Sequence, residues 1–307
     1  MNPTPTTKAS GLARFGLGTV QLGMAYGLSN HHGQPGLKEA QAILNLAREE
    51  GLSLLDTAPA YGQSEQVLGN FLHPTHPFKI VTKTPSFIQS SHISDQSVLE
   101  LVASFQRSLK RLRIPRIYGL LIHRAADLLM PGGERLWLEM QGLVEAGLVE
   151  KIGVSVYSGE EIDAILERFS PTLIQLPINL FDQRLIASGH LRRLKDRGVE
   201  IHARSIFLQG VLLMAAEAVP DYFEPVRGDL LRYQKYLQEI GWSRLRGALA
   251  FVMSLEELDH ILVGVATSDE LADIVEEAAT VHDTFPDWEP FALKGERFLN
   301  PALWETA

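Results

Sequence analysis

Short apolar segments alternate with longer amphipathic segments along the whole chain, and this alternation limits the possible folds more than any other feature. The short segments have the length of buried strands, and the longer ones space their apolar residues as amphipathic helices do. We therefore predict strands over Arg14–Gly18, Leu52–Asp56, Lys79–Lys83, Ile117–His123, Lys151–Ser155, Thr172–Leu176, Val199–Ser205 and Ile261–Gly264. Helices are predicted over Lys38–Glu50, Gln63–Phe71, Asp95–Leu112, Glu134–Ala146, Gly159–Phe169, Ala187–Arg197, Leu230–Ile240, Trp242–Met253 and Asp269–Thr280.

Strands that alternate with helices predict a parallel sheet, and about eight such units in 307 residues favour a closed (β/α)8 TIM barrel. No shift in composition divides the chain. We therefore expect a single α/β domain over residues 1–307, with a flexible segment at about 1–10 and a C-terminal tail at about 282–307. The alternative is an open, doubly wound sheet with G-x-G-x-x-G after an early strand. Gly16 and Gly18 begin that motif, but Gln21 replaces its third glycine.

Composition and charge exclude several classes of function. The net charge of −9 does not fit the basic footprint of a nucleic-acid-binding protein. The absence of cysteine excludes disulfides, thiolate metal sites and a cysteine nucleophile. No apolar run approaches the roughly 20 residues of a membrane-spanning helix, and residues 1–10 lack the apolar core of a secretory signal. We expect a cytoplasmic protein that binds neither nucleic acid nor membrane.

The sequence gives no sign of a metal site. The adjacent His31 and His32 precede a glycine and fit a solvated loop better than a chelating pair, so we expect no metal. The sequence does not indicate an oligomeric state.

Polar residues end most of the predicted strands, which are otherwise apolar. In a (β/α)8 barrel the chemistry takes place at the C-terminal ends of the strands, so these residues would share one cleft. They are Asp56, Lys83, His123, Ser155, Gln175 and the pair Arg204–Ser205.

Asp56, Tyr61, Lys83 and His123 could together transfer a proton. A tyrosine with a pKa near 10 is a poor proton shuttle, but a neighbouring ammonium such as Lys83 would lower that pKa. Asp56 could hold Lys83, and His123 could orient a carbonyl group. Each residue alone also fits an ordinary role: Asp56 and Tyr61 in turns, Lys83 reaching solvent, His123 bonded in the core. Their joint placement favours the protonation of a carbonyl oxygen while a cofactor delivers hydride to the carbon.

The stretch LLDTAPAYGQSEQVLG resembles the aldo-keto reductase family. The match continues, in order, through VTK, LLIH, GLVEKIGVS, IQLPINL, ARSIFLQGVLL and ILVGVATSDELADI. The resemblance implies a (β/α)8 barrel, an NADP or NAD cofactor lying extended across its mouth, and a small-molecule carbonyl substrate. Tyr61 would be the general acid, with Asp56, Lys83 and His123 completing a tetrad. The implied cofactor contacts are Gly18, Thr19, Asp56, Ser155, Gln175, Arg204, Ser205, Gln209, Gly210, Gly264, Thr267, Ser268 and Glu270.

Three positions depart from the family pattern, as in a less-studied bacterial branch. Val156 replaces an asparagine that would contact the nicotinamide carboxamide. Arg204 stands where an aromatic residue often stacks on the nicotinamide, and its guanidinium could either stack or attract an anionic substrate. The segment Val265–Ala272 holds no Arg or Lys for a 2′-phosphate, so the resemblance favours NADP over NAD only narrowly.

Two other functions fit the same residues. Lys83 could instead be the nucleophile of a Schiff-base aldolase. Some barrels of this kind, such as potassium-channel β subunits, act mainly as cofactor-binding partner proteins with little turnover. Tyr222, Phe223 and Arg227 follow the seventh strand and could line a substrate pocket or pack on the rim, whereas Trp288 and Trp304 fit packing anchors.

Overall fold

The computed structural model describes residues 12–73, 75–282 and 285–304, and its strands form one closed parallel barrel. The strands are β1 Phe15–Gly18, β2 Leu54–Asp56, β3 Lys79–Lys83, β4 Ile117–Ile122, β5 Val149–Ser155, β6 Leu173–Pro177, β7 Glu200–Arg204 and β8 His260–Gly264. Each strand pairs with the next, and β8 closes the ring on β1 with Gly264 opposite Gly18. The predicted (β/α)8 barrel is confirmed.

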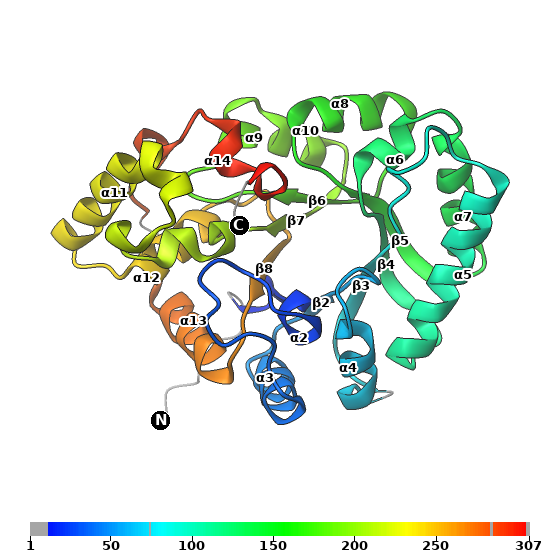
Figure 1. Cartoon of the computed structure of the whole chain (residues 1–307), viewed down its shortest axis with the longest axis horizontal. Helices are drawn as coiled ribbons and strands as arrows, with labels where there is room; N and C mark the ends of the chain where they lie inside the picture. Colours follow the sequence, from blue (N-terminus) through cyan, green and yellow to red (C-terminus); the bar gives the residue numbers. More distant parts are fainter. Residues whose placement is uncertain (1–11, 74, 283–284, 305–307) are drawn as a thin grey trace, which may run out of the picture.

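The helices surround the barrel (Figure 1). They are α2 Val20–Gly23, α3 Leu37–Glu49, α4 Ser64–Phe71, α5 Asp95–Leu112, α6 Ala125–Leu129, α7 Gly133–Glu145, α8 Gly159–Arg168, α9 Arg184–Ala187, α10 His190–Asp196, α11 Arg227–Glu239, α12 Arg244–Met253, α13 Ser268–Thr280 and α14 Glu296–Leu299. Short 3-10 turns are η1 Leu208–Leu213, η2 Ala216–Ala218, η3 Asp221–Val226, η4 Glu289–Phe291 and η5 Pro301–Leu303. The buried faces of the long helices carry the apolar residues whose spacing predicted them, such as Ala40, Ile43, Leu44 and Ala47 of α3.

The structure differs from the predicted elements mainly where a local conformation interrupts a pattern. The single helix predicted over Ala187–Arg197 is wrong, because Gly189 adopts a left-handed φ of 74° and separates α9 from α10. The seventh strand ends one residue earlier than predicted, because Ser205 also has a left-handed φ, of 58°. The short helix α6, which covers one and a half turns, was not predicted.

Small residues let side chains fill the inside of the barrel. Leu54, Val81, Leu121, Leu173 and Leu262 form a buried cluster there. Gly119 lies on β4, and a Cβ at this position would lie 2.9 Å from the side chain of Leu173. The barrel is therefore a packed core with no room for larger residues at such positions, and it leaves only its two ends free for polar chemistry.

The N-terminal end of the barrel, its floor, carries a buried polar group made by Glu200, His202 and His260. Burial lowers the pKa of His260 to about 4, so its ring is neutral near pH 7. Burial alone would raise the pKa of Glu200, but hydrogen bonds from His202, Lys151 and Tyr118 outweigh it, and the net shift is downward.

The C-terminal tail, drawn in red in Figure 1, packs beside the connection that follows β7. The hydroxyl of Tyr222 donates to the carbonyl of Arg297 at 2.8 Å, and the rings of Phe223 and Trp304 meet edge to face at 5.0 Å. These residues join the η3 turn to the tail. Residues 1–10, expected to be flexible, lie outside the described part of the chain.

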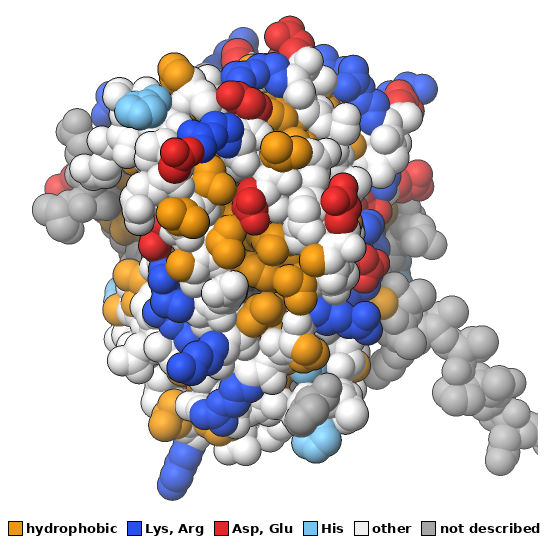
Figure 2. Space-filling view, turned by 90° about the vertical axis from the view of Figure 1, so that its right-hand side faces the viewer, with side chains coloured by type: hydrophobic (Ala, Val, Ile, Leu, Met, Phe, Trp, Pro, Cys, Tyr) orange, Lys and Arg blue, Asp and Glu red, His pale blue; other side chains and the backbone are white. Residues whose placement is uncertain are grey.

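Figure 2 looks onto the side formed by α5 and α7, where an apolar area is surrounded by charged side chains. Leu99 of α5 and Leu138 of α7 are 62% and 69% exposed. Among the described helices, none is both long and apolar enough to cross a bilayer.

Candidate active site

A cavity of about 500 Å³ opens at the C-terminal ends of the strands, where the sequence placed the chemistry. Nearly all of the predicted site residues line this cavity, although they come from all eight strands and the loops that follow them. They are Gly18, Thr19, Asp56, Tyr61, Lys83, His123, Ser155, Gln175, Arg204, Ser205, Gln209, Gly210, Gly264 and Glu270.

An ion pair between Lys83 and Asp56 lies at the base of this cavity. The Lys83 Nζ donates to both carboxylate oxygens of Asp56, at 2.7 and 2.8 Å, and to the carbonyl of Thr57 at 3.1 Å. The two side chains are only 1% and 7% exposed. Burial alone would lower the pKa of Lys83, but the charges and hydrogen bonds of Asp56 and Tyr61 together outweigh burial and raise that pKa, so the amine stays protonated.

Tyr61 stands over this ion pair because two glycines allow its loop to approach α2. The Lys83 Nζ lies 4.9 Å from the centre of the Tyr61 ring. A Cβ on Gly23 would lie 1.8 Å from the carbonyl oxygen of Tyr61. Gly62 has a left-handed φ of 56°, and a Cβ there would lie 2.3 Å from the carbonyl oxygen of Gly23. No other residue type fits these two positions without moving the tyrosine.

His123 completes the group from the end of β4. Its ring meets that of Tyr61 edge to face, with 6.0 Å between the ring centres. Burial lowers the pKa of His123 to about 3, and the charge of Lys83 adds to this effect. The imidazole is therefore neutral at physiological pH and can donate or accept a hydrogen bond.

Lys83 lowers the pKa of Tyr61 as expected, but the expected net lowering of that pKa is wrong. Burial raises the pKa of Tyr61 more than the nearby Lys83 lowers it, so the net shift is upward. Asp56 contributes to the rise, because its charge partly cancels that of Lys83 at the phenol. The phenol is thus held in its protonated form.

The cavity fits the carboxamide end of a nicotinamide cofactor. Gln175 is fully buried and donates through Nε2 to the Oδ1 of Asp56 at 2.7 Å, while its Oε1 has no hydrogen-bond partner among the described residues. A buried amide oxygen without a partner is costly, and a carboxamide N–H would satisfy it. Ser155, opposite Gln175 in the register of β5 and β6, also lines the cavity.

The loop after β7 fits an anionic part of such a cofactor. The described residues contain four non-glycine positions with left-handed φ, and three of them, Ser205, Leu208 and Gln209, lie in this loop. Strained conformations persist where function requires them, and turns of this kind can direct backbone N–H groups toward an anion. Gly210 is packed so closely on Ser29 that a Cβ would lie 1.8 Å from its hydroxyl oxygen.

Two predicted cofactor residues do not line the cavity. Thr267 caps α13 by accepting from the N–H of Glu270 at 3.1 Å, and Ser268 donates through its hydroxyl to Glu39 at 2.7 Å. Both therefore serve the start of α13 and its contact with α3. The sequence places them on the correct loop but cannot tell capping residues from ligand-facing ones.

Arg204 lies in the cavity with its guanidinium 4.2 Å from the centre of the Tyr157 ring. It donates to the carbonyl of Val156 at 3.1 Å and to the Ser205 hydroxyl at 3.4 Å. No carboxylate pairs with it among the described residues. The side chain of Val156, the departure from the family pattern, is fully buried and does not line the cavity.

The sequence did not predict the loop that covers one side of the cavity. This loop contributes Tyr26, Gly27, Ser29 and Asn30 to the lining of the cavity. The Tyr26 hydroxyl accepts a hydrogen bond from the Gln209 amide at 3.2 Å. Tyr157 was also missed, although it follows Ser155 by two residues. No motif marks the loop, because its contribution depends on its contact with a segment about 180 residues away.

The residues after β7 that were weighed as substrate contacts serve packing. Phe223 is fully buried against the tail, and Arg227 pairs with Glu224 at 2.6 Å. Trp288 packs against Trp242, Phe251 and Phe291. None of these lines the cavity.

Comparisons with known proteins agree with this geometry. The model of the aldo/keto reductase family matches residues 14–285. The chain is 30% identical over 179 residues to the aldo-keto reductase YhdN of Bacillus subtilis, over 56% of this chain and 52% of that protein. It is 27% identical over 214 residues to an Oryza sativa protein named "Probable voltage-gated potassium channel subunit beta", over 66% of this chain and 64% of that one. The alignments thus span about half to two thirds of these relatives.

A solved structure is similar over nearly the whole chain. It is a crystal structure of a Pseudomonas aeruginosa protein assigned to the aldo-keto reductases, with a TM-score of 0.65 and 25% sequence identity. The similarity covers 87% of this chain and 90% of that one.

The ion pair can be tested by a double-mutant cycle on stability. We expect Asp56→Asn to lower the free energy of unfolding by about 3–5 kcal/mol, because it leaves a buried ammonium without a counter-charge. Adding Lys83→Met should recover a large part of that loss, since the unpaired charge is then gone. Urea unfolding followed by circular dichroism measures both. Losses that simply add in the double variant would contradict the coupling.

Proposed function

The chain belongs to the aldo/keto reductase family, and we propose that it is an NAD(P)H-dependent oxidoreductase that interconverts a carbonyl group and an alcohol. The observation that supports this most is the group formed by Tyr61, Lys83, Asp56 and His123 at one end of the cavity. The similarity to the aldo-keto reductase YhdN of Bacillus subtilis is consistent with this proposal.

The proposed reduction needs a proton at the carbonyl oxygen and a hydride at the carbonyl carbon. A bound nicotinamide would supply the hydride, because no side chain can. Tyr61 gives its hydroxyl proton to the carbonyl oxygen as the C–O bond becomes single, and the product is the alcohol. Lys83 stabilises the phenolate left behind, while Asp56 keeps Lys83 in place. A proton from water then restores the phenol.

The upward pKa shift of Tyr61 suits this direction of reaction. A proton donor must be protonated before it reacts, and burial ensures that at neutral pH. Neutral His123 can donate a hydrogen bond to the carbonyl oxygen and so fix its position against the phenol. Water is excluded from much of this site, since Asp56, Lys83 and Gln175 are all buried.

A Schiff-base aldolase is less consistent with these residues. Its lysine must lose a proton to become a nucleophile, and a lowered pKa normally achieves that. The pKa of Lys83 is raised, and its amine is fully engaged with Asp56 and Thr57. The role of a cofactor-binding partner protein with little turnover remains an outcome of the test below.

Tyr61→Phe is the direct test. We expect a loss of about 100-fold or more in kcat for reduction of a simple aromatic aldehyde, because the general acid is removed. Tyr26→Phe is the matched control: it removes a hydroxyl of the same cavity whose hydrogen bond, among the described residues, is with Gln209, and it should keep most activity. Cofactor binding, followed by quenching of protein fluorescence, should change little in either variant.

Equal aldehyde reduction by wild type and Tyr61→Phe would exclude Tyr61 as the proton donor. Tight cofactor binding with no reduction across a broad carbonyl panel in the wild type would favour the partner-protein role instead.

The choice between NADH and NADPH depends on the charges near α13. Glu270 and Asp273 line that part of the cavity, and the cationic lining residues Lys83 and Arg204 lie at strand ends instead. By the family resemblance the adenosine end would lie there, so a 2′-phosphate would meet carboxylates. We therefore propose NADH as the tighter ligand, against the narrow preference for NADP that the resemblance favours.

Parallel fluorescence titrations with NADH and NADPH measure this preference. We expect the Kd for NADH to be at least about threefold lower than the Kd for NADPH. Asp273→Asn should bring the two Kd values closer together, because it removes a negative charge that repels the 2′-phosphate of NADPH. NADPH binding more tightly than NADH to the wild type would contradict the proposal.

Arg204 favours substrates that carry a negative charge. It is a partly buried guanidinium with no carboxylate partner among the described residues. Two of its five N–H groups donate to Ser205 and Val156, and the other three make no hydrogen bond with the described residues. An unpaired cation in such a position gains most from an anionic ligand. We propose that aldehydes or ketones with a carboxylate near the carbonyl are reduced in preference to neutral ones.

Aldehydes of matched size, with and without a carboxylate, test this role. In the wild type we expect the charged aldehyde to have a KM about tenfold lower, and Arg204→Met should remove that preference while leaving kcat for the neutral aldehyde nearly unchanged. A preference that persists in Arg204→Met would exclude the role. A cofactor Kd that rises in the variant, with the preference unchanged, would assign Arg204 to the cofactor.

A further inference from the structure

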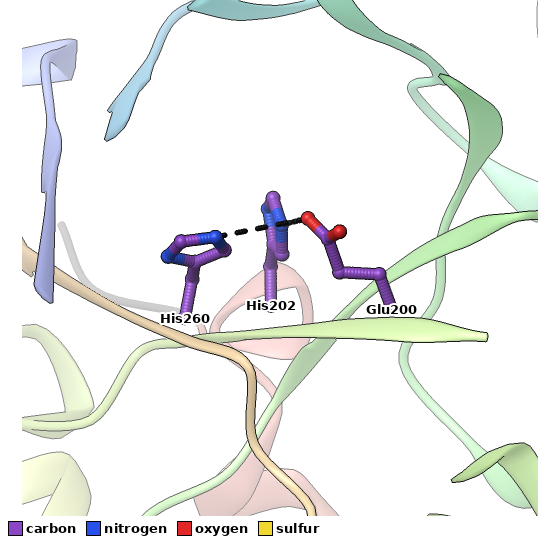
Figure 3. A group of neighbouring side chains, drawn as sticks. All are labelled: Glu200, His202 and His260. Atoms are coloured by element: carbon purple, nitrogen blue, oxygen red, sulfur yellow. Dashed lines mark hydrogen bonds and ion pairs between the residues drawn. The ribbon is translucent and has the colours of Figure 1, made fainter. Parts of the chain in front are cut away.

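A second constellation of ionisable side chains lies at the floor of the barrel, at the opposite end from the cavity. Glu200 and His202 are two residues apart on β7, so both point to the same face of the strand. His260 begins β8 and pairs in register with His202. Figure 3 shows the three side chains on the same side of these strands, with the carboxylate turned toward the imidazole rings.

The carboxylate of Glu200 divides its contacts between its two oxygens. Oε2 accepts from Lys151 Nζ at 2.5 Å and from the Tyr118 hydroxyl at 2.6 Å. Oε1 faces the histidines and lies 2.7 Å from Nε2 of His202 and 3.7 Å from Nε2 of His260. Lys151 and Tyr118 thus fix the orientation of Glu200 through Oε2, as outer contacts do for a metal-binding carboxylate, and Oε1, which His202 contacts, is turned toward the two imidazoles.

The protonation of His260 leaves a lone pair aimed at that oxygen. Ser53 has one hydroxyl proton, which it donates to the carbonyl of Ala13 at 2.8 Å. Its oxygen therefore accepts from His260, and the 3.3 Å contact places the ring proton on Nδ1. Nε2 of the neutral ring then carries a lone pair opposite the Glu200 carboxylate. Two acceptors that face each other in a buried place repel, unless a cation lies between them.

We propose that Glu200 Oε1, His202 Nε2 and His260 Nε2 bind one divalent transition-metal ion, with Zn²⁺ as the best-fitting ion. Two imidazoles and a carboxylate are a donor set that zinc accepts. Glu200 Oε1 lies 2.7 Å from Nε2 of His202 and 3.7 Å from Nε2 of His260, and bonds of about 2.1 Å to tetrahedral zinc require spacings of about 3.4 Å, so His202 would have to move away from Glu200 by less than about 1 Å.

Binding needs no net change in protonation. The ring proton of His202 would move from Nε2 to Nδ1. Nδ1 is buried and has no hydrogen-bond partner among the described residues. His260 and Glu200 already present lone pairs. The fourth tetrahedral position would be left to water, because the Glu200 side chain is 11% exposed.

An ion at this position would act on stability and not on hydride transfer. It would join the beginning of β7 to the beginning of β8, while the cavity residues Arg204 and Gly264 end the same two strands. In this fold, residues at the N-terminal face of the barrel contribute to stability and not to catalysis. A ligand that binds only the folded chain raises the free energy of unfolding.

The test uses the full chain after treatment with a chelator. Zn²⁺ is titrated in competition with a chromophoric chelator, and thermal unfolding is recorded with and without Zn²⁺. We expect one tightly bound Zn²⁺ per chain and a rise in Tm of a few degrees. His260→Gln should weaken that binding at least about tenfold and remove the zinc-dependent rise in Tm. The matched control, His31→Gln, changes an exposed loop histidine and should behave as wild type.

A second measurement does not depend on the folding of a variant. Co²⁺ added to the wild-type chain should give visible absorption bands of a low-coordinate nitrogen and oxygen site, and Zn²⁺ should abolish them. Equal zinc affinity in wild type and His260→Gln, or no such bands with Co²⁺, would overturn the proposal. Aldehyde reduction should be unchanged by chelation, and its loss would overturn the structural role assigned to the ion.

Discussion

A lysine and an aspartate, both removed from water, are joined by two hydrogen bonds at the base of the cavity, and the chemistry of the cavity depends on this contact. An isolated ammonium could not remain charged at this depth. With Asp56 in place, Lys83 keeps its proton and presents a positive charge to Tyr61. The same carboxylate accepts from Gln175, so Asp56 links Lys83, which lies beside the proposed proton donor Tyr61, to the residue expected to hold the cofactor.

The backbone around this ion pair explains how distant segments meet. Asp56 and Lys83 end β2 and β3, and Gln175 lies two residues before the end of β6, so a closed parallel barrel brings them together whatever their separation in sequence. Tyr61 is different, because it lies on a loop and not on a strand. Its position rests on the contact of Gly23 and Gly62, which brings the loop against α2. The strands thus position the charged side chains, and the two glycines allow the loop that carries Tyr61, the proposed proton donor, to reach them.

The sequence predicted the barrel and the strand-end residues because both follow from periodicity. A strand end is visible where an apolar run stops at Asp56, Lys83 or Gln175. The direction of the Tyr61 pKa shift was not predictable, since it depends on how much of the phenol is buried, and only the packed structure determines that. The same holds for Thr267 and Ser268, whose hydroxyls are used in capping and in the contact with Glu39. The loop containing Tyr26 was missed because its position depends on a contact with Gln209, which is 183 residues away in the sequence.

The strand β7 contributes to both ends of the barrel. Glu200, His202 and Arg204 alternate along it, so all three point inward, and about 13 Å separates the first from the last at a rise of about 3.3 Å per residue. The first two belong to the floor and the third to the cavity. Between these levels the apolar cluster that includes Leu173 and Leu262 separates the two polar groups. The distance of about 13 Å, and not the apolar layer itself, weakens the electrostatic coupling between the floor and the cavity, because Coulomb interaction falls with separation whereas an apolar layer does not screen it. The spacing of two residues that identifies an inward-facing strand position therefore also explains how one strand can support the stability of the barrel at one end and its chemistry at the other.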